Sequence, residues 1–348
     1  MKSYSFYGLL ELTSDEGGRH RYRRYLDNEY ERMNVHLPAI GRPGVHAPKI
    51  ELAIVRSLPR EEPGDIRRDA NFKGLFTYSY LVRGLYDRIV RVFFQDHPVS
   101  RIYTTAVGVY LQAHVLEPIM YLKLLDSDLL LMHAAGVERD GHAHVYAASG
   151  GTGKTTFSIA LLDAGFKLLG DDLLIVDVRR NLVYPYPRPL HLFAYNATGL
   201  RGVRLPRRYR VAISGKNVLR FVLERSLRAE FLISTRVHAD EIIPGGVFGD
   251  VATVDTVGFL LKEGEAVELV ALDSASVPRI ADEIIDSSDL NRSLYTMLAD
   301  NEAVASVRAR EHDVVATLLR HHAHFLYVNP RKLELDEPLS VAEHVVDR

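Results

Sequence analysis

The chain has 348 residues, 47% of them hydrophobic and 25% charged, which is the composition of a soluble globular protein with one large or two ordinary domains. Its formal net charge of -2 gives no overall attraction to nucleic acid or to an anionic membrane, so we expect neither as a partner. The absence of cysteine excludes disulfides, thiolate catalysis and cysteine-ligated zinc, and it fits a cytoplasmic location.

The first third of the chain reads as an α+β region. Segments rich in proline and glycine predict loops on either side of a short strand, at 37–49 and 58–65 for the loops and Ile50–Val55 for the strand. A second strand-like stretch, RIYTTAVGV, covers Arg101–Val109. Apolar residues then follow helical spacing over Tyr110–Leu125, where Pro118 is expected to kink the helix.

From Leu129 onward, segments typical of buried strands alternate with helical ones, and the chain closes with a helix at Glu311–His322 and a strand at Ala323–Val328. A hairpin signal at Arg139-Asp140-Gly141 favours mixed rather than purely parallel pairing. We therefore expect an accessory, substrate-recognition domain at residues 1–120 and an α/β nucleotide-binding domain with a mixed sheet at 121–348.

The most informative motif is Ala-Ser-Gly-Gly-Thr-Gly-Lys-Thr-Thr, from Ala148 to Thr156. Its glycines let backbone N–H groups converge on a phosphate, and Lys154 adds a positive charge for the β- and γ-phosphates. The Thr155 hydroxyl can ligate Mg²⁺. The run matches the phosphate-loop pattern except that Ala148 replaces the first glycine. The predicted nucleotide-binding residues are Ser149, Gly150, Gly151, Thr152, Gly153, Lys154, Thr155 and Thr156.

The context of the motif supports this interpretation. A strand is predicted before it at His144–Ala147, and a helix after it at Thr156–Ala164, with Gly165 as the stop. The alternative is a glycine-rich turn with a chance Lys-Thr pair. Strand, glycine loop and helix in this order favour nucleotide binding, because the helix directs its positive end at the bound anion.

Two adjacent carboxylates, Asp171 and Asp172, follow in the run LLGDDLLIV. Burying such a pair between apolar segments is costly unless a metal ion or hydrogen bonds compensate. Neighbouring strand residues point in opposite directions, so one aspartate can hold Mg²⁺ while the other accepts the proton of an attacking hydroxyl. The alternative is a turn with two solvated aspartates.

Other candidates are single residues or basic runs. His133 lies on an apolar stretch, where a lone histidine is usually a satisfied core residue. Arg201–Arg210 holds five arginines in ten residues and could close over the γ-phosphate, hold an anionic acceptor or form a solvated loop. Arg188 is the better single candidate, because prolines flank it on both sides, and which arginine contacts the γ-phosphate stays open.

Taken together, the runs HAAG, VERDG, SGGTGKTT and LLGDD resemble the HPr kinase/phosphorylase superfamily, which shares its fold with ATP-dependent phosphoenolpyruvate carboxykinase. The proline-rich step Tyr184–Leu190 and the closing FLYVNP are also similar to that family, so the resemblance covers roughly 105–330. It implies a P-loop nucleotide-binding core of the HPr kinase/phosphoenolpyruvate carboxykinase type with a mixed sheet, and a smaller N-terminal α+β accessory domain.

The resemblance also implies roles for individual residues. Lys154 and the loop would bind the phosphates of ATP, and Thr155 with Asp172 would hold Mg²⁺. Asp171 would be the general base, and His133 would lie beside the transferred phosphate. The basic glycine-rich segment that follows the acidic pair in true HPr kinases is not found here. The resemblance therefore does not extend to HPr as the substrate or to the phosphorylase reaction.

These patterns predict an ATP-dependent kinase that moves the γ-phosphoryl group to an acceptor hydroxyl, a serine of a peptide or small protein. A small-molecule kinase acting on a sugar, polyol or amino acid is a second candidate, and nothing in the sequence separates the two. A third is a nucleotide-sensing regulatory module without catalysis. The sequence leaves open whether the chain forms a homo-oligomer.

Overall fold

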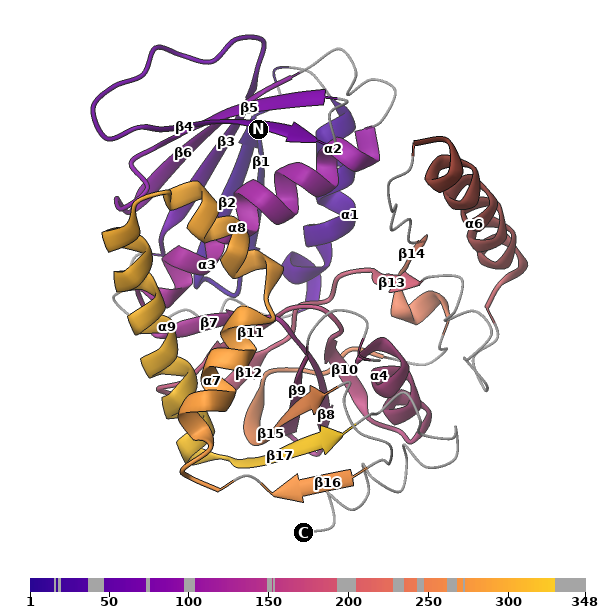
Figure 1. Cartoon of the computed structure of the whole chain (residues 1–348). Helices are drawn as coiled ribbons and strands as arrows, with labels where there is room; N and C mark the ends of the chain where they lie inside the picture. Colours follow the sequence, from indigo (N-terminus) through magenta and orange to yellow (C-terminus); the bar gives the residue numbers. More distant parts are fainter. Residues whose placement is uncertain are drawn as a thin grey trace. The chain divides into compact units, whose positions relative to one another are not determined.

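The computed structural model describes residues 1–15, 17, 20–36, 47–72, 76–96, 104–148, 152, 154–192, 205–227, 235–242, 247–261, 268–271 and 273–328 (Figure 1). It is a mixed α/β structure with mixed sheets, as the sequence predicts. Contacts divide the chain into two compact units: unit 1 is Met1–Leu131 with Ser288–Ala316, and unit 2 is Met132–Ser287 with Thr317–Arg348. The functional division at residues 120 and 121 stays a prediction.

Unit 1 contains a six-stranded sheet in the order β1-β2-β3-β6-β5-β4. The pairs β2–β3 and β3–β6 are parallel, and the remaining pairs are antiparallel. On β3, buried and half-buried residues alternate, so one face of the sheet supplies the core. The strands are β1 (Lys2–Phe6), β2 (Leu10–Asp15), β3 (Lys49–Val55), β4 (Ile66–Phe72), β5 (Phe76–Arg83) and β6 (Ile89–Gln95).

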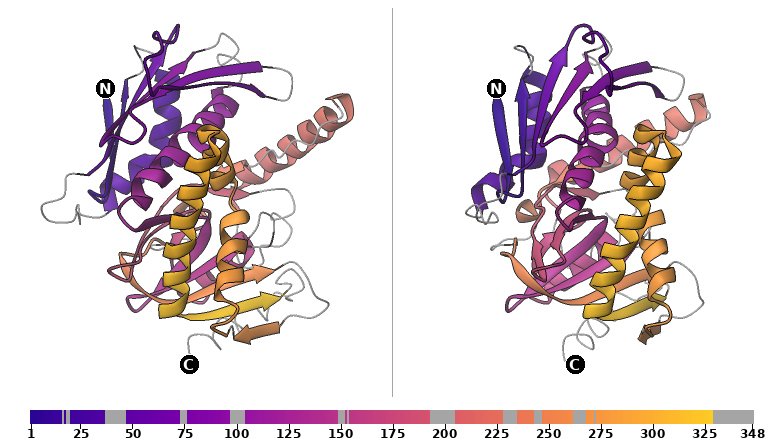
Figure 2. Two further views of the ribbon diagram at one scale, coloured as in Figure 1. Left: turned by 60° about the vertical axis from the view of Figure 1, so that its left-hand side comes forward. Right: turned by 90° about the vertical axis from the view of Figure 1, so that its left-hand side faces the viewer.

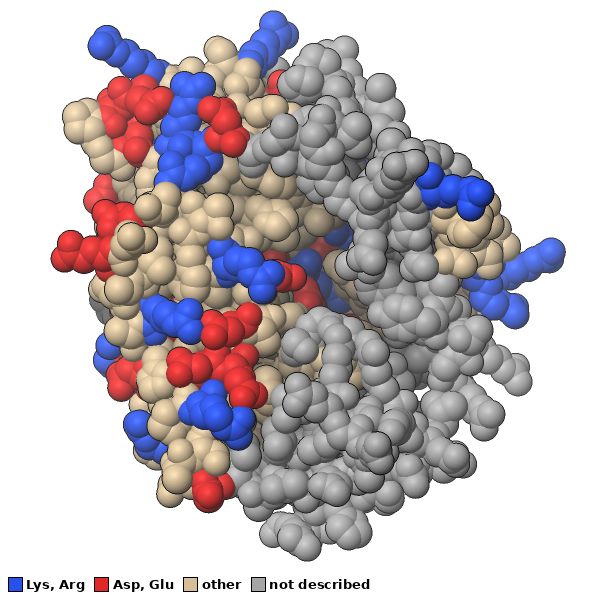
Figure 3. All heavy atoms as spheres, viewed as in Figure 1, with Lys and Arg blue, Asp and Glu red and all other residues tan. Residues whose placement is uncertain are grey.

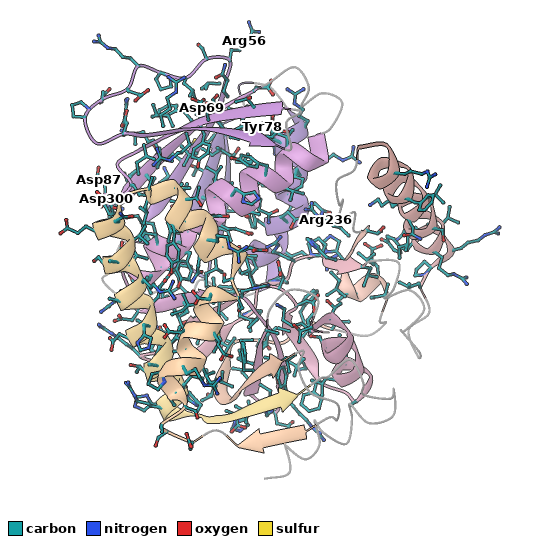
Figure 4. The ribbon with its side chains drawn as sticks, in the orientation of Figure 1. Arg56, Asp69, Tyr78, Asp87, Arg236 and Asp300 are labelled. Atoms are coloured by element: carbon teal, nitrogen blue, oxygen red, sulfur yellow. The ribbon has the colours of Figure 1, made fainter. Side chains whose placement is uncertain are left out.

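Helices of unit 1 supply the rest of its core. The helix α1 connects the parallel strands β2 and β3 and buries Tyr22 and Leu26 completely. Tyr78 on β5, labelled in Figure 4, stacks on Tyr110 with 4.8 Å between ring centroids, which joins the sheet to α2. The helices are α1 (His20–His36), α2 (Thr104–Leu111), a π-helix (Gln112–Leu116), α3 (Glu117–Leu125) and α8 (Asp289–Leu298).

The strand predicted at Arg101–Val109 is wrong for its described part, because Thr104–Leu111 forms α2. The physical reason is a close approach that only glycine allows. A Cβ added at Gly108 would lie 2.6 Å from the ring of Tyr25, so this tyrosine of α1 packs directly on the α2 backbone. Tertiary packing therefore overrides the strand tendency of the two threonines and two valines.

The helix predicted at Tyr110–Leu125 is confirmed, and its regular hydrogen bonding changes just before Pro118. A π-helix spans Gln112–Leu116, and the N–H of Glu117 donates to the carbonyl of Gln112. Pro118 lacks an N–H and stands in the first turn of α3, where a missing donor costs least. Helix α3 continues as a wholly buried helix to Leu125.

Unit 2 is built around a second mixed sheet, in which the order β10-β8-β9-β15-β12-β11 is continuous. Strands β9 and β15 are parallel, as are β15 and β17, whereas the other pairs are antiparallel. The strands are β8 (Ala134–Arg139), β9 (His142–Ala148), β10 (Lys167–Gly170), β11 (Leu174–Asp177), β12 (Leu182–Tyr184), β15 (Ala252–Leu261), β16 (Glu268–Ala271) and β17 (Ala323–Val328).

Short-range predictions in unit 2 are confirmed. The β8–β9 hairpin turns at Asp140 and Gly141, which both have positive φ angles of 54° and 82°. The helix α4 (Lys154–Asp163) follows the glycine-rich segment and ends before Gly165, whose φ is +91°. The predicted strand at Ala323–Val328 also forms.

The remaining elements of unit 2 include a two-stranded sheet of β13 and β14, which pair antiparallel. Both views of Figure 2 show α6 as a long helix that projects from unit 2. These elements are β13 (Leu190–Leu192), α6 (Arg207–Leu227), β14 (Thr235–Val237), a 3₁₀ helix (Ala239–Glu241) and α7 (Val277–Asp286). Along the chain, β7 (Leu129–Met132) and α9 (Asn301–His321) each pass from one unit to the other.

No helix in the described part of the chain combines the length and the apolar character that crossing a lipid bilayer requires.

Candidate active site

The strand register of unit 2 brings three chain segments to one edge of its sheet. Ala134 at the start of β8 pairs with Ala147 near the end of β9, and Gly136 pairs with Gly170 at the end of β10. His133 precedes β8, the glycine-rich segment follows β9, and the two aspartates follow β10. Antiparallel pairing of β8 with both neighbours therefore gathers these residues, although they are distant in sequence.

Gly170 makes the acidic turn possible. A Cβ at this position would lie 2.5 Å from the carbonyl oxygen of Leu173, so any side chain would force the backbone apart. The N–H of Tyr186 donates to the carbonyl of Leu169 at 2.7 Å, which fixes the proline-rich segment beside the end of β10. Arg188 is thereby placed near the aspartates from a separate part of the chain.

Lys154 begins α4 and is largely buried. Its Nζ donates to the carbonyl of Ala148 at 2.7 Å and lies 2.9 Å from Nε2 of His133. The hydroxyl of Ser158, one turn along α4, donates to the Lys154 carbonyl at 3.1 Å. The lysine is thus held at the junction of strand and helix, where a phosphate loop needs its positive charge.

Thr155 and Asp171 are directly joined, because the threonine Oγ1 donates to Oδ2 of Asp171 at 2.9 Å. The other carboxyl oxygen, Oδ1, is buried and has no hydrogen-bond partner among the described residues. Burial raises the pKa of Asp171 to about 6, and the charge of Asp172 adds to the rise, while the hydroxyls of Thr155 and Ser158 and the charge of Lys154 oppose it. A carboxyl group tuned in this way can take up a proton near neutral pH.

Asp172 has the opposite electrostatic setting. Its Oδ1 lies 3.2 Å from Nε2 of His133, and its Oδ2 lies 3.7 Å from a guanidinium nitrogen of Arg188. Burial alone would raise the pKa of Asp172, but the His133 hydrogen bond and the charges of His133, Arg188 and His191 outweigh it and hold the pKa well below its usual range. Asp172 therefore stays ionised, and the environments of the adjacent carboxyls push their pKa values apart.

Arg188 is 8% exposed, and its guanidinium carbon lies 6.0 Å from the ring centroid of Tyr186. The nearly buried guanidinium of Arg188 lies next to Asp172, which agrees with the choice of Arg188 over the other arginines as a candidate site residue. Of the basic run, Arg207, Arg208 and Arg210 lie in the first turn of α6, and Arg201 and Arg204 lie outside the described residues.

Part of the predicted phosphate loop is also outside the described residues. These positions are Ser149, Gly150, Gly151 and Gly153. Thr152 is fully buried, and Thr156 belongs to α4. The loop conformation therefore stays a prediction, whereas Lys154, Thr155, His133 and the two aspartates are placed together by contacts.

Two residues of this region are not among the site residues that the sequence predicts. Tyr186 packs near Arg188, and His191 on β13 contributes positive charge to Asp172. A signal for Tyr186 was present, since it belongs to the same proline-flanked run as Arg188. His191 had none, because its nearness to Asp172 depends on how β13 folds back against the sheet.

The donor set suits a metal ion that is held jointly with a phosphorylated ligand. In the described part of the chain, no group of three or more His, Cys, Asp or Glu side chains could enclose a metal ion by itself. Mg²⁺ commonly binds through one or two protein oxygens together with substrate phosphates. Hydroxyl and carboxylate oxygens of Thr155, Asp171 and Asp172 fit that chemistry.

No protein-family model matches the chain, and no curated protein is detectably similar to it in sequence.

Proposed function

We propose that this chain is an ATP-dependent phosphotransferase of the HPr-kinase-like type. Its acceptor is a hydroxyl group, which we assign to a serine of a peptide or small protein. The observation that carries the proposal is the Asp171 carboxyl, with one oxygen on Thr155, the other without a partner among the described residues, and a pKa of about 6. A buried proton acceptor beside Lys154 is what phosphoryl transfer to a hydroxyl needs.

In this proposal Asp171 takes the proton of the acceptor hydroxyl. The acceptor oxygen forms a bond to the γ-phosphorus as the bond from that phosphorus to the bridging oxygen breaks, and ADP leaves with the electron pair of the broken bond. Lys154 and Arg188 offset the negative charge of the transferred group, and His133, whose Nε2 lies 2.9 Å from Nζ of Lys154, lies beside that group.

Mg²⁺, when bound, supplies neutralisation of phosphate charge. Thr155 and Asp172 are the residues we propose to hold it. The hydrogen bond from Thr155 leads to Asp171 rather than Asp172, so the division of roles between the two aspartates needs its own test.

The proposal is tested by incubating the full chain with γ-labelled ATP and Mg²⁺, together with serine-bearing peptides and a panel of sugars, polyols and amino acids. Labelled phosphate is expected on a peptide serine. Lys154→Ala should abolish transfer, whereas Lys167→Ala, which changes a half-exposed lysine on β10, should not. Label on a metabolite alone would favour a small-molecule kinase, and tight ATP binding without turnover would favour a nucleotide-sensing module.

A further inference from the structure

One long face of α6 is exposed and carries apolar side chains. Val211, Val218 and Phe221 are 64%, 65% and 66% exposed. With exposed Ser214 between them, they follow the 3-4-3 spacing of a coiled-coil seam, and we call these four residues the α6 seam. Burying large apolar side chains is favourable, so a helix that presents three of them in one line is suited to a partner.

The opposite face of the helix is anchored in unit 2. Ile213 is 4% exposed and belongs to a core cluster with Leu192 and Val237, and Tyr209 packs against the same cluster. Arg236, labelled in Figure 4, lies on the neighbouring strand β14. The α6 seam is therefore the outer side of a helix whose inner side is already packed.

Basic residues stand at both ends of the α6 seam. Arg207 and Arg210 are exposed in the first turn, and Arg225 is exposed in the last turn. Arg208 pairs with Glu241 and is therefore less available to a partner. Figure 3 shows blue basic side chains beside tan ones at the right-hand edge, where α6 lies. No acidic residue stands in the first turn, although positive charge is unfavourable at a helix N-terminus.

We infer that the α6 seam docks an acidic amphipathic helix of a partner protein. That helix would bring apolar side chains at its a and d positions and Asp or Glu on the flanks. Its carboxylates would meet Arg207 and Arg210 at one end of the seam and Arg225 at the other. The inference does not depend on the proposed phosphotransfer.

Charge and a polar residue within the seam argue against two other occupants. If two copies of this chain paired through α6, parallel helices would place Arg207 of one copy against Arg207 of the other. Antiparallel helices would place Arg207 of one copy against Arg225 of the other, so like charges would meet in either direction. A helix that lies on a lipid surface needs a broad apolar face. Ser214 interrupts the apolar line of the α6 seam.

The test uses a fluorescent peptide of about 21 residues, three heptads with Leu at a and d and Glu at e and g, and a copy with Lys in place of Glu. Anisotropy with the full chain should show binding of the Glu peptide only. The double variant Val218→Ser/Phe221→Ser should weaken that binding by about tenfold or more, because the central apolar contacts of an interface dominate its affinity. Both side chains are exposed, so the fold should persist.

Tyr86→Ser is the matched control, because Tyr86 is also 66% exposed but lies on a turn of unit 1. It should leave peptide binding unchanged. The inference is overturned if the Glu peptide does not bind, if both peptides bind equally, or if the double variant binds as tightly as the original chain. If the original chain binds phosphatidylserine vesicles and the double variant does not, the seam is a lipid-binding surface and the inference is overturned. If the original chain sediments as a dimer and the double variant as a monomer, the seam is a self-association surface and the inference is likewise overturned.

Discussion

The Thr155 hydroxyl donates a hydrogen bond to the Asp171 carboxylate at 2.9 Å, across a separation of 16 residues. This bond joins the first turn of α4 to the turn after β10, and it leaves Oδ1 of Asp171 buried without a partner among the described residues. A buried carboxyl oxygen that no described residue hydrogen-bonds is poised to accept a proton from a ligand. Asp172 contrasts with it, because His133 and Arg188 hold its pKa well below the usual range.

The rate of phosphotransfer should depend on pH through Asp171. Burial raises the pKa of this carboxyl to about 6, and only its deprotonated form accepts a proton. The rate should therefore be low at pH 5, rise through about pH 6 and level off above pH 7. Single-turnover rates with saturating ATP measure this directly. A profile that is flat across the same range would exclude Asp171 as the group that titrates.

The roles of the two aspartates can be separated by their effects on nucleotide affinity. His133 and Arg188 keep the Asp172 carboxyl ionised, and Asp172→Asn removes its negative charge. The variant should therefore bind ATP about tenfold more weakly in the presence of Mg²⁺, whereas its ATP affinity without the metal should change much less. Isothermal titration with and without Mg²⁺ checks this. If Asp171→Asn instead loses ATP affinity only in the presence of Mg²⁺, Asp171 is the metal ligand and Asp172 the proton acceptor. The hydrogen bond from Thr155 to Asp171 would fit that assignment.

Gly170→Ala should distort the acidic turn, since the added Cβ would lie 2.5 Å from the Leu173 carbonyl oxygen. We expect a loss of stability of about 1–3 kcal/mol, together with reduced transfer. Urea unfolding followed by circular dichroism measures the first effect. The matched control is Gly215→Ala in α6, where the new Cβ would have no described atom within 4 Å apart from its chain neighbours and the helix's own backbone. That change should stabilise the helix by about 0.5–1 kcal/mol, and equal losses in both variants would contradict the steric explanation.

Sequence patterns predict the part of unit 2 that depends on local signals. The strand before the glycine-rich segment, the helix α4 after it and the turn at Asp140-Gly141 are set by glycines and by apolar spacing within a few residues. The residue types of Lys154, Asp171, Asp172 and His133 suit phosphate chemistry, which is why the sequence predicts them as site residues. The structure places Nε2 of His133 2.9 Å from Lys154 and 3.2 Å from Asp172, and it joins Asp171 to Thr155 by a hydrogen bond.

What the sequence could not supply depends on contacts between distant segments. Helix α2 replaces a predicted strand because Tyr25 packs on Gly108, and the sequence near residue 108 does not predict this contact. Residues 288–316 join unit 1, where Arg68 of β4 donates to the carbonyl of Met297 at 2.8 Å, although 229 residues separate the two. His191 reaches the surroundings of Asp172 only through the placement of β13.

Whether Asp171 is the proton acceptor of a phosphotransfer reaction is tested most directly by measuring both phosphate transfer and ATP affinity of Asp171→Asn. The asparagine keeps the shape of the side chain but cannot take the proton, so transfer should fall by about 10²–10⁴-fold while ATP still binds. Asp140→Asn, at a turn where the aspartate is 90% exposed, is the control and should keep full activity. Near-normal transfer by Asp171→Asn with intact ATP binding would contradict the account.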